Sequence, residues 1–221
     1  GRRARRWPAR RSRCGARSSV EELLTPGARG WVGLAAGFGV AALALFGVAP
    51  TTLDWQPVLV WREPWRAFSA IAVHYSALHL AANLAGLALV GALGVVARVP
   101  RASVAAWAVA WPLTQLGLLW RPDLVHYGGL SGVLHGGAAV VAVHLICGGP
   151  TARRLIGAAL LAGITLKVLG EAPWGPALRH PAGWDIATAP FAHATGLVAG
   201  VVCALAAAMW HARASTIAAD A

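Results

Sequence analysis

The stretch GGLSGVLHGG, residues 128–137, decides the fold that we expect of this chain, because it sets one serine among five glycines. Residues 128, 131, 132, 135 and 136 recur at intervals of three and four, so they share one face of a helix. That face carries almost no side-chain bulk, which lets a second helix approach closely. The sequence therefore predicts a tight helix contact at which one hydroxyl, that of Ser131, is placed.

The composition is that of a membrane protein. Of the 221 residues, 57% are hydrophobic and only 12% are charged, whereas a soluble domain has about 25% charged residues. The net charge of +11 does not indicate nucleic acid as a partner, because eight of the 19 basic residues lie within residues 1–17. Three cysteines, Cys14, Cys147 and Cys203, are far apart and match no metal-binding or redox spacing.

Six charge-poor segments follow one another along the chain and predict six membrane-spanning helices. They comprise residues 31–53, 67–97, 102–120, 124–152, 155–170 and 186–210. The predicted fold is an all-α polytopic membrane protein, a bundle of six transmembrane helices. We divide the chain into a basic, disordered cytoplasmic tail (1–28), the membrane domain (29–213) and a short C-terminal tail (214–221).

The charges of the loops predict the orientation of these helices. Basic residues occupy the N-terminal tail and the loops that hold Arg98, Arg101, Arg153 and Arg154, whereas the other loops mix arginine with acidic residues. Because basic loops remain in the cytoplasm, both termini are expected there.

Four polar side chains within the segments are expected at a similar depth, in the outer part of the bilayer. His79 and Asn83 share one face of the second segment, Ser131 lies near the start of the fourth, and His193 lies about two turns into the sixth. Polar groups are costly inside a membrane, so we interpret these four as a functional site.

These side chains fit nucleophilic catalysis. A serine hydroxyl needs an adjacent base, and histidine is the side chain that titrates near neutral pH. A tetrahedral oxyanion needs donors that are fixed in advance. We therefore expect Ser131 to be the nucleophile, His193 the base, and His79, Asn83 and the backbone N–H of Ser131 the oxyanion donors.

The acidic residues are expected to stay out of this site. All eight Asp and Glu residues lie outside the uncharged segments, which favours a Ser–His dyad over a triad. Lys167 is expected to point outward to water, although Glu171 is within reach one turn further along. No metal or organic cofactor is indicated, since the chain has no His-Glu-x-x-His motif and no acidic residue in the segments.

Together these residues resemble the rhomboid family of intramembrane serine proteases. The resemblance covers residues 61–200 in chain order and rests on three motifs: Trp65-Arg66 with Phe68, His74, His79-Leu80 and Asn83; Gly129-Leu130-Ser131-Gly132; and Ala192-His193 with Gly196 and Gly200. It implies a rhomboid-like six-helix bundle in which Ser131 and His193 form the dyad and two side chains support the oxyanion, His79 and Asn83. We also expect supporting roles for His74, Gly129, Gly132, His135, Gly196 and Gly200.

One position departs from that family. Many rhomboids have a tyrosine four residues after the serine, and here that residue is His135. Residues 128–137, together with Lys167 and Glu171, most resemble the rhombosortase subfamily, bacterial rhomboids associated with proteins that end in a Gly-Gly motif, an apolar helix and a basic tail. His135 lies one turn from Ser131 and stays an alternative base, although its side chain leans toward the N-terminal turn.

The expected function is cleavage of membrane-anchored proteins near the outer face of the bacterial inner membrane. The expected partners are such substrates and the lipid bilayer, with no nucleic acid and no metal. Three alternatives remain open: a rhomboid protease with other substrates, a rhomboid-like protein that binds membrane clients without cutting them, and a small transporter that uses the histidines as a proton relay.

Overall fold

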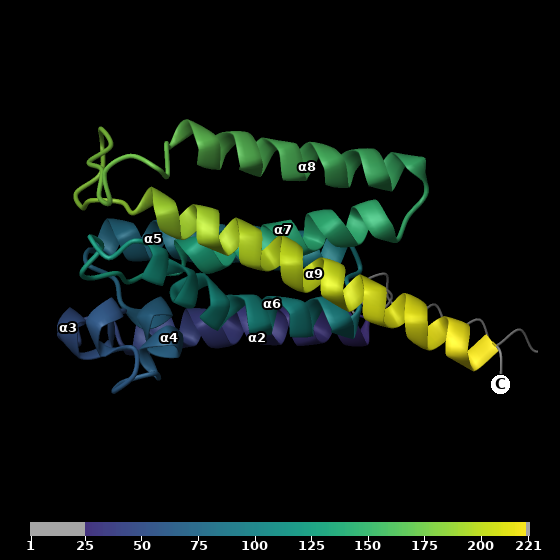
Figure 1. The fold of residues 1–221 in the computed structure, drawn as a ribbon, viewed down its shortest axis with the longest axis horizontal. Coiled ribbons are helices and arrows are strands. Elements are labelled where there is room, and N and C mark those ends of the chain that lie inside the picture. The colour runs from purple at the N-terminus through teal and green to yellow at the C-terminus, as the bar shows by residue number, and fades with distance from the viewer. Residues whose placement is uncertain (1–24, 220–221) are drawn as a thin grey trace, which may run out of the picture.

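The protein is a bundle of helices, and its structure, a computed structural model, describes residues 25–219 (Figure 1). In this range the six long helices are α2 (Pro26–Ala44), α5 (Ala77–Val96), α6 (Arg101–Leu116), α7 (Ser131–Cys147), α8 (Thr151–Gly170) and α9 (Pro190–Ala219). Shorter helical pieces are α3 (Pro50–Leu53), η1 (Pro57–Leu59), α4 (Arg66–Ser69), η2 (Ala70–Ala72) and η3 (Gly117–Trp120). Each charge-poor segment of the sequence therefore overlaps one long helix, although α2, α6 and α8 begin before their segments and α9 ends after its segment.

Among the described residues, four helices are long and apolar enough to cross a membrane. They are α2, α5, α6 as continued by η3, and α9 as far as Trp210. Helix α7 is apolar but has only 17 residues, and α8 carries three charged side chains, those of Arg153, Arg154 and Lys167. The chain is a multi-pass membrane protein in which α7 and α8 complete the helical bundle.

The helix boundaries follow from local sequence signals. Helix α5 begins at Ala77, well after residue 67, because the Ser76 Oγ accepts a hydrogen bond from the N–H of His79 at 3.1 Å and caps the helix. Helix α9 begins at Pro190, a residue that favours the first helical turn. It continues to Ala219, past the boundary at residue 214 expected from the sequence. Residues 1–24 of the expected N-terminal tail lie outside the described residues, as do 220–221.

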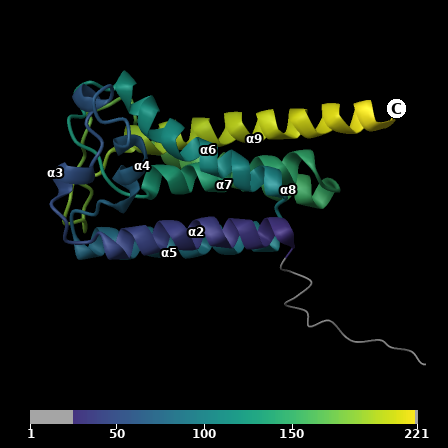
Figure 2. The same cartoon turned by 90° about the horizontal axis from the view of Figure 1, so that it is seen from below.

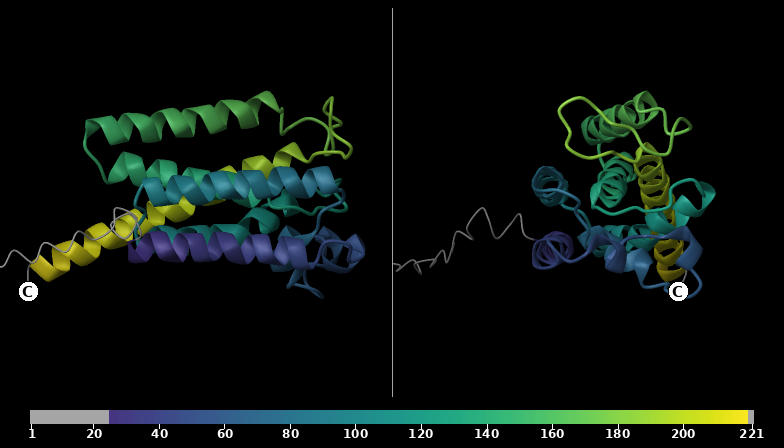
Figure 3. Two further views of the ribbon diagram at one scale, coloured as in Figure 1. Left: turned by 180° about the vertical axis from the view of Figure 1, so that it is seen from behind. Right: turned by 90° about the vertical axis from the view of Figure 1, so that its left-hand side faces the viewer.

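Helix α7 lies inside the bundle and α8 lies at its edge (Figures 1 and 3). Most residues of α7 are buried, whereas in α8 only Gly157 and Val168 are. Two buried tryptophans, Trp31 of α2 and Trp107 of α6, stack with their ring centroids 4.2 Å apart. The Trp107 indole N–H donates to the carbonyl of Val133 at 2.9 Å, and this contact fixes the first turn of α7 against α6.

The two ends of the bundle differ in their connections. The short connections 97–100 and 148–150 and the arginines beside them lie at the end where α2 begins and α9 ends (Figure 2). The longer connections, including residues 171–189, gather at the opposite end. The loops that the sequence assigns to the cytoplasm therefore share one end of the molecule.

Candidate functional site

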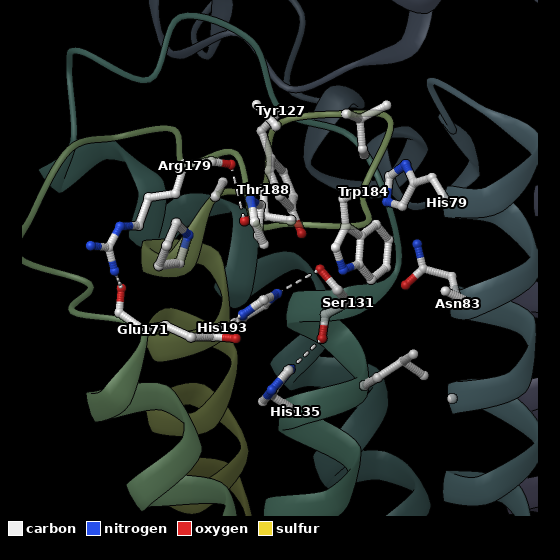
Figure 4. A pocket seen from close by; sticks show the side chains of 18 of the residues that line it. His79, Asn83, Tyr127, Ser131, His135, Glu171, Arg179, Trp184, Thr188 and His193 are labelled. Carbon is white, nitrogen blue, oxygen red and sulfur yellow. Dashed lines mark hydrogen bonds and ion pairs between the residues drawn. The ribbon is translucent and has the colours of Figure 1, made fainter.

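A cavity of about 1050 Å³ opens at the end of the bundle that holds the long connections. Its walls come from α5, α7, the end of α8, the start of α9 and the connection 171–189 (Figure 4). All four polar residues that the sequence placed at one depth line this cavity: His79, Asn83, Ser131 and His193.

Ser131 is the first residue of α7, and the turn before it is built on Gly129. Gly129 has φ +122°, a backbone conformation that side chains other than that of glycine rarely adopt. A Cβ at this position would also lie 2.7 Å from Nε2 of His79. The turn therefore brings Ser131 to the N-terminus of α7, where the first N–H groups have no partner within the helix.

His193 lies in the first turn of α9, and its Nε2 is 3.0 Å from Oγ of Ser131. The two helices approach so closely that backbone meets backbone. A Cβ at Gly132 would lie 2.7 Å from the carbonyl oxygen of Ala192, and a Cβ at Gly196 would contact the carbonyl oxygen of Gly132. The close approach that the glycine face predicted is present, and it brings the serine and the histidine within hydrogen-bonding distance.

The expectation that no carboxylate reaches this site is wrong. Oε2 of Glu171 lies 2.6 Å from Nδ1 of His193, and Oε1 lies 2.7 Å from Nζ of Lys167. Glu171 follows the last turn of α8, so a count of uncharged segments places it outside the membrane, yet its side chain reaches back to the start of α9. The spacing of four residues between Lys167 and Glu171 was the one available signal for this pair.

The charge of Glu171 is well defined. Burial raises the pKa of its carboxyl, but the hydrogen bonds and charges of His193 and Lys167 outweigh burial and lower the pKa from 4.5 to about 2. Glu171 is therefore a carboxylate at neutral pH, with His193 at one oxygen and Lys167 at the other.

Lys167 and His135 also differ from expectation. Instead of pointing outward, the Lys167 ammonium lies 3.0 Å from Nε2 of His135 and faces the site, although about half of its side chain is exposed. Nδ1 of His135 lies 2.7 Å from the backbone oxygen of Ser131, and its ring stacks on that of His193 with centroids 4.4 Å apart. Both ring nitrogens of His135 are thus engaged away from the Ser131 hydroxyl.

The two side chains of α5 face Ser131 from the other side of the cavity (Figure 4). Nδ1 of His79 accepts a hydrogen bond from the N–H of Tyr75 at 3.4 Å, so Nε2 carries the ring proton. Nδ2 of Asn83 is buried and has no hydrogen-bond partner among the described residues. His74 supports this wall, since its ring lies 4.8 Å from that of His79. The wall therefore presents two N–H donors to the space beside Ser131.

The connection 171–189 covers the cavity, a feature that the sequence did not reveal. Its backbone pairs with itself between Arg179 and Thr188, and Ser76 donates to Asp185 at 2.8 Å across the opening. Trp184 lies above Ser131 in this cover (Figure 4). Nothing in the local sequence shows that this connection folds back over the cavity.

The arrangement contains the parts of a serine hydrolase: a hydroxyl, an imidazole in contact with it, a carboxylate behind the imidazole, and N–H donors opposite. Among the residues that the structure describes, no three His, Cys, Asp or Glu side chains are grouped as a metal ion would require.

The chain matches a protein-family model over most of its length. A model described as the rhomboid domain matches residues 61–210, more than half of the chain, and the match includes His79, Asn83, Ser131, Glu171 and His193. None of the curated proteins that were compared with the chain matches it.

Proposed function

We propose, from the premise that the chain belongs to the rhomboid family, that it is an intramembrane serine endopeptidase with Ser131 as nucleophile and His193 as general base. One observation carries this proposal: Oγ of Ser131 and Nε2 of His193 are 3.0 Å apart in a cavity that is covered by the connection 171–189. The family match alone supports a protease-like function, and this contact supplies its two reacting groups.

The reaction follows from the positions of these groups. Nε2 of His193 takes the hydroxyl proton as Oγ of Ser131 bonds to the carbonyl carbon of the substrate. The oxyanion forms beside Nδ2 of Asn83, Nε2–H of His79 and the N–H of Ser131, at the start of α7. His193 then gives the proton to the departing amine. Water hydrolyses the resulting ester by the same steps and regenerates Ser131.

The proposed setting is the bacterial inner membrane, with both termini in the cytoplasm and the cavity near the outer face. The arginine-flanked connections 97–100 and 148–150 support this orientation, because they share the end of the bundle opposite the cavity. In this setting all six long helices span the bilayer. The substrates are then proteins anchored in the same membrane.

Within the family, the proposed substrates are C-terminal anchors that begin with a Gly-Gly pair, as in the rhombosortase subfamily. Residues 128–137 and the contact between His135 and Lys167 support this assignment. A peptide bond within a stable helix is shielded, so the substrate must unwind to reach Ser131. Glycine helps because each residue costs a helix about 1 kcal/mol relative to alanine.

Two further functions compete with this one. A rhomboid protease with other substrates would share the site and differ only in what it cuts. A rhomboid-like protein that binds clients without cutting them would not need the contact between Ser131 and His193, which speaks against it.

The proposal is tested by labelling the purified protein with a fluorophosphonate. Wild type should be labelled, and Ser131→Ala should not. A second experiment co-expresses the enzyme with a reporter that carries a Gly-Gly anchor and with a twin in which both glycines are leucine. Cleavage of the first reporter alone is expected. Equal cleavage of both would discard the substrate assignment and leave the protease standing.

A further inference from the structure

A closed series of hydrogen bonds links the backbone and the hydroxyl of Ser131 through α8 and α9. It runs from the Ser131 carbonyl to His135 (2.7 Å), Lys167 (3.0 Å) and Glu171 (2.7 Å), and then to His193 (2.6 Å) and back to Oγ of Ser131 (3.0 Å). The chemistry of the proposed reaction uses only the last of these contacts. The role of the other four follows from where their protons lie.

The carboxylate decides the protonation of His193. An ionised carboxylate only accepts hydrogen bonds, so the contact of Glu171 with Nδ1 requires a proton on Nδ1. A neutral ring then has its lone pair on Nε2, which faces Oγ of Ser131. This is the tautomer that a general base needs.

Lys167 makes a competing contact with the same nitrogen. Its Nζ lies 3.4 Å from Nδ1 of His193, and an ammonium only donates, so this contact requires the opposite tautomer. The distance of 2.6 Å to Glu171 is far shorter and decides in favour of the carboxylate. Lys167 has other acceptors, since both Oε1 of Glu171 and Nε2 of His135 lie within 3.0 Å.

The same reasoning assigns His135. The Ser131 carbonyl accepts from Nδ1, so Nε2 carries the lone pair and accepts from Lys167. Every bond in the series then has one donor and one acceptor. His135 has no lone pair left for the Ser131 hydroxyl, which removes it as an alternative base and leaves it stacked against His193.

We propose that Glu171 and Lys167 are positioning residues of this site: Glu171 holds the His193 ring in the tautomer that accepts the Ser131 proton, and Lys167 holds Glu171 and His135 in place. This inference rests on the proposed function. When the proton moves to His193, Glu171 also stabilises the imidazolium that forms. Arg179, a charged residue of the connection 171–189, donates to the backbone oxygen of Glu171 and leaves both carboxylate oxygens to the series.

The test compares Glu171→Gln with Glu171→Asp in the full-length protein in detergent micelles. Gln can donate to Nδ1 and so favours the wrong tautomer, and we expect a loss in kcat of roughly 10³-fold with KM within about twofold of wild type. Asp keeps the carboxylate, and kcat of Glu171→Asp should be at least about tenfold higher than that of Glu171→Gln.

A second pair of variants tests Lys167. Lys167→Met should lower kcat, and Lys167→Arg, which keeps the positive charge, should restore most of it. Asp123→Asn, which removes an exposed carboxylate paired with Arg121, is the matched control and should behave as wild type.

A second measurement is independent of turnover. Nitrogen-15 NMR of labelled histidine, with His193 assigned by the His193→Gln variant, reports which ring nitrogen carries the proton. We expect the proton on Nδ1 in wild type and on Nε2 in Glu171→Gln. An unchanged kcat or an unchanged tautomer in Glu171→Gln would overturn the inference. If wild type neither cleaves nor reacts with a fluorophosphonate, it is the proposed function that fails.

Discussion

Helices α9 and α8 both bring side chains to Ser131, but they are held against α7 in different ways. Helix α9 is held by backbone contact, since Gly196 and Gly200 lie against the carbonyls of Gly132 and Gly136. Helix α8 buries only Gly157 and Val168, and it approaches the backbone of α7 closely only far from the site, where a Cβ at Gly157 would lie 2.7 Å from the carbonyl oxygen of Ala142. Next to Ser131, α8 contributes the charged side chains at its end.

The difference corresponds to two tasks. Transfer of a proton needs a fixed distance between Oγ of Ser131 and Nε2 of His193, and close backbone packing leaves the two helices little room to move apart. For Nε2 of His193 to accept that proton, a carboxylate must keep the other ring proton on Nδ1. Hydrogen bonds from a peripheral helix are enough to hold such a carboxylate in place. Substitutions in the two helices should therefore differ in both the size and the kind of their effects.

The largest effect is expected at the contact between α7 and α9. Ser131→Ala and His193→Ala should each lower kcat by a factor on the order of 10⁴ or more, because they remove the nucleophile or its base. Initial rates on a reporter substrate measure this, with circular dichroism as the check on folding. The assignment of the base is wrong if His193→Ala cuts at the wild-type rate while His135→Ala does not cut.

The next effect concerns packing. Gly196→Val should push α9 away from α7, because its Cβ would contact the carbonyl oxygen of Gly132. We expect loss of most activity and a lower Tm. Gly163→Val on α8 is the matched control, since a Cβ there meets open space, and it should be tolerated. Wild-type activity in Gly196→Val would show that close packing of the two helices is not needed.

A smaller effect is expected across the cavity. Asn83→Ala should lower kcat by roughly 10²-fold, the scale for loss of one oxyanion donor, while KM changes little. Steady-state kinetics with a peptide or reporter substrate separate the two constants. A change in KM alone would make Asn83 a substrate contact and not an oxyanion donor.

The smallest expected effect is on thermal stability at acid pH, and it tests whether the carboxylate of Glu171 helps to hold α8 against the bundle. The pKa of Glu171 is lowered by its partners, so its contribution to folding stability is complete above pH 4.5 and is lost as the pH falls toward about 2. As the pH falls through this range, the Tm of wild type should therefore decrease more steeply than the Tm of Glu171→Gln, whose side chain does not titrate. Parallel curves for the two proteins would show that the carboxylate does not help to hold α8.

The sequence by itself predicted the long helices and one of the two helix contacts compared above, the close approach of a second helix to the glycine face of α7. The spacing of glycines around Ser131 is local, and periodicity within one helix tells which residues share a face. It therefore predicted that a second helix could lie against residues 128–136. The cost of polar groups in a membrane was enough to single out His79, Asn83 and His193 from the sequence alone.

Only the tertiary structure decided the place of Glu171, Lys167 and the connection 171–189. These residues follow or end a helix, and the direction in which a chain returns after a helix depends on everything that it packs against. A run of uncharged residues indicates where the backbone crosses the membrane. It does not indicate where a long side chain just beyond the end of a helix points, and the side chain of Glu171 points back toward the site. The sequence thus singled out the serine and the histidine of the proposed dyad, whereas the carboxylate beside the histidine became visible only once α8 and α9 were placed side by side.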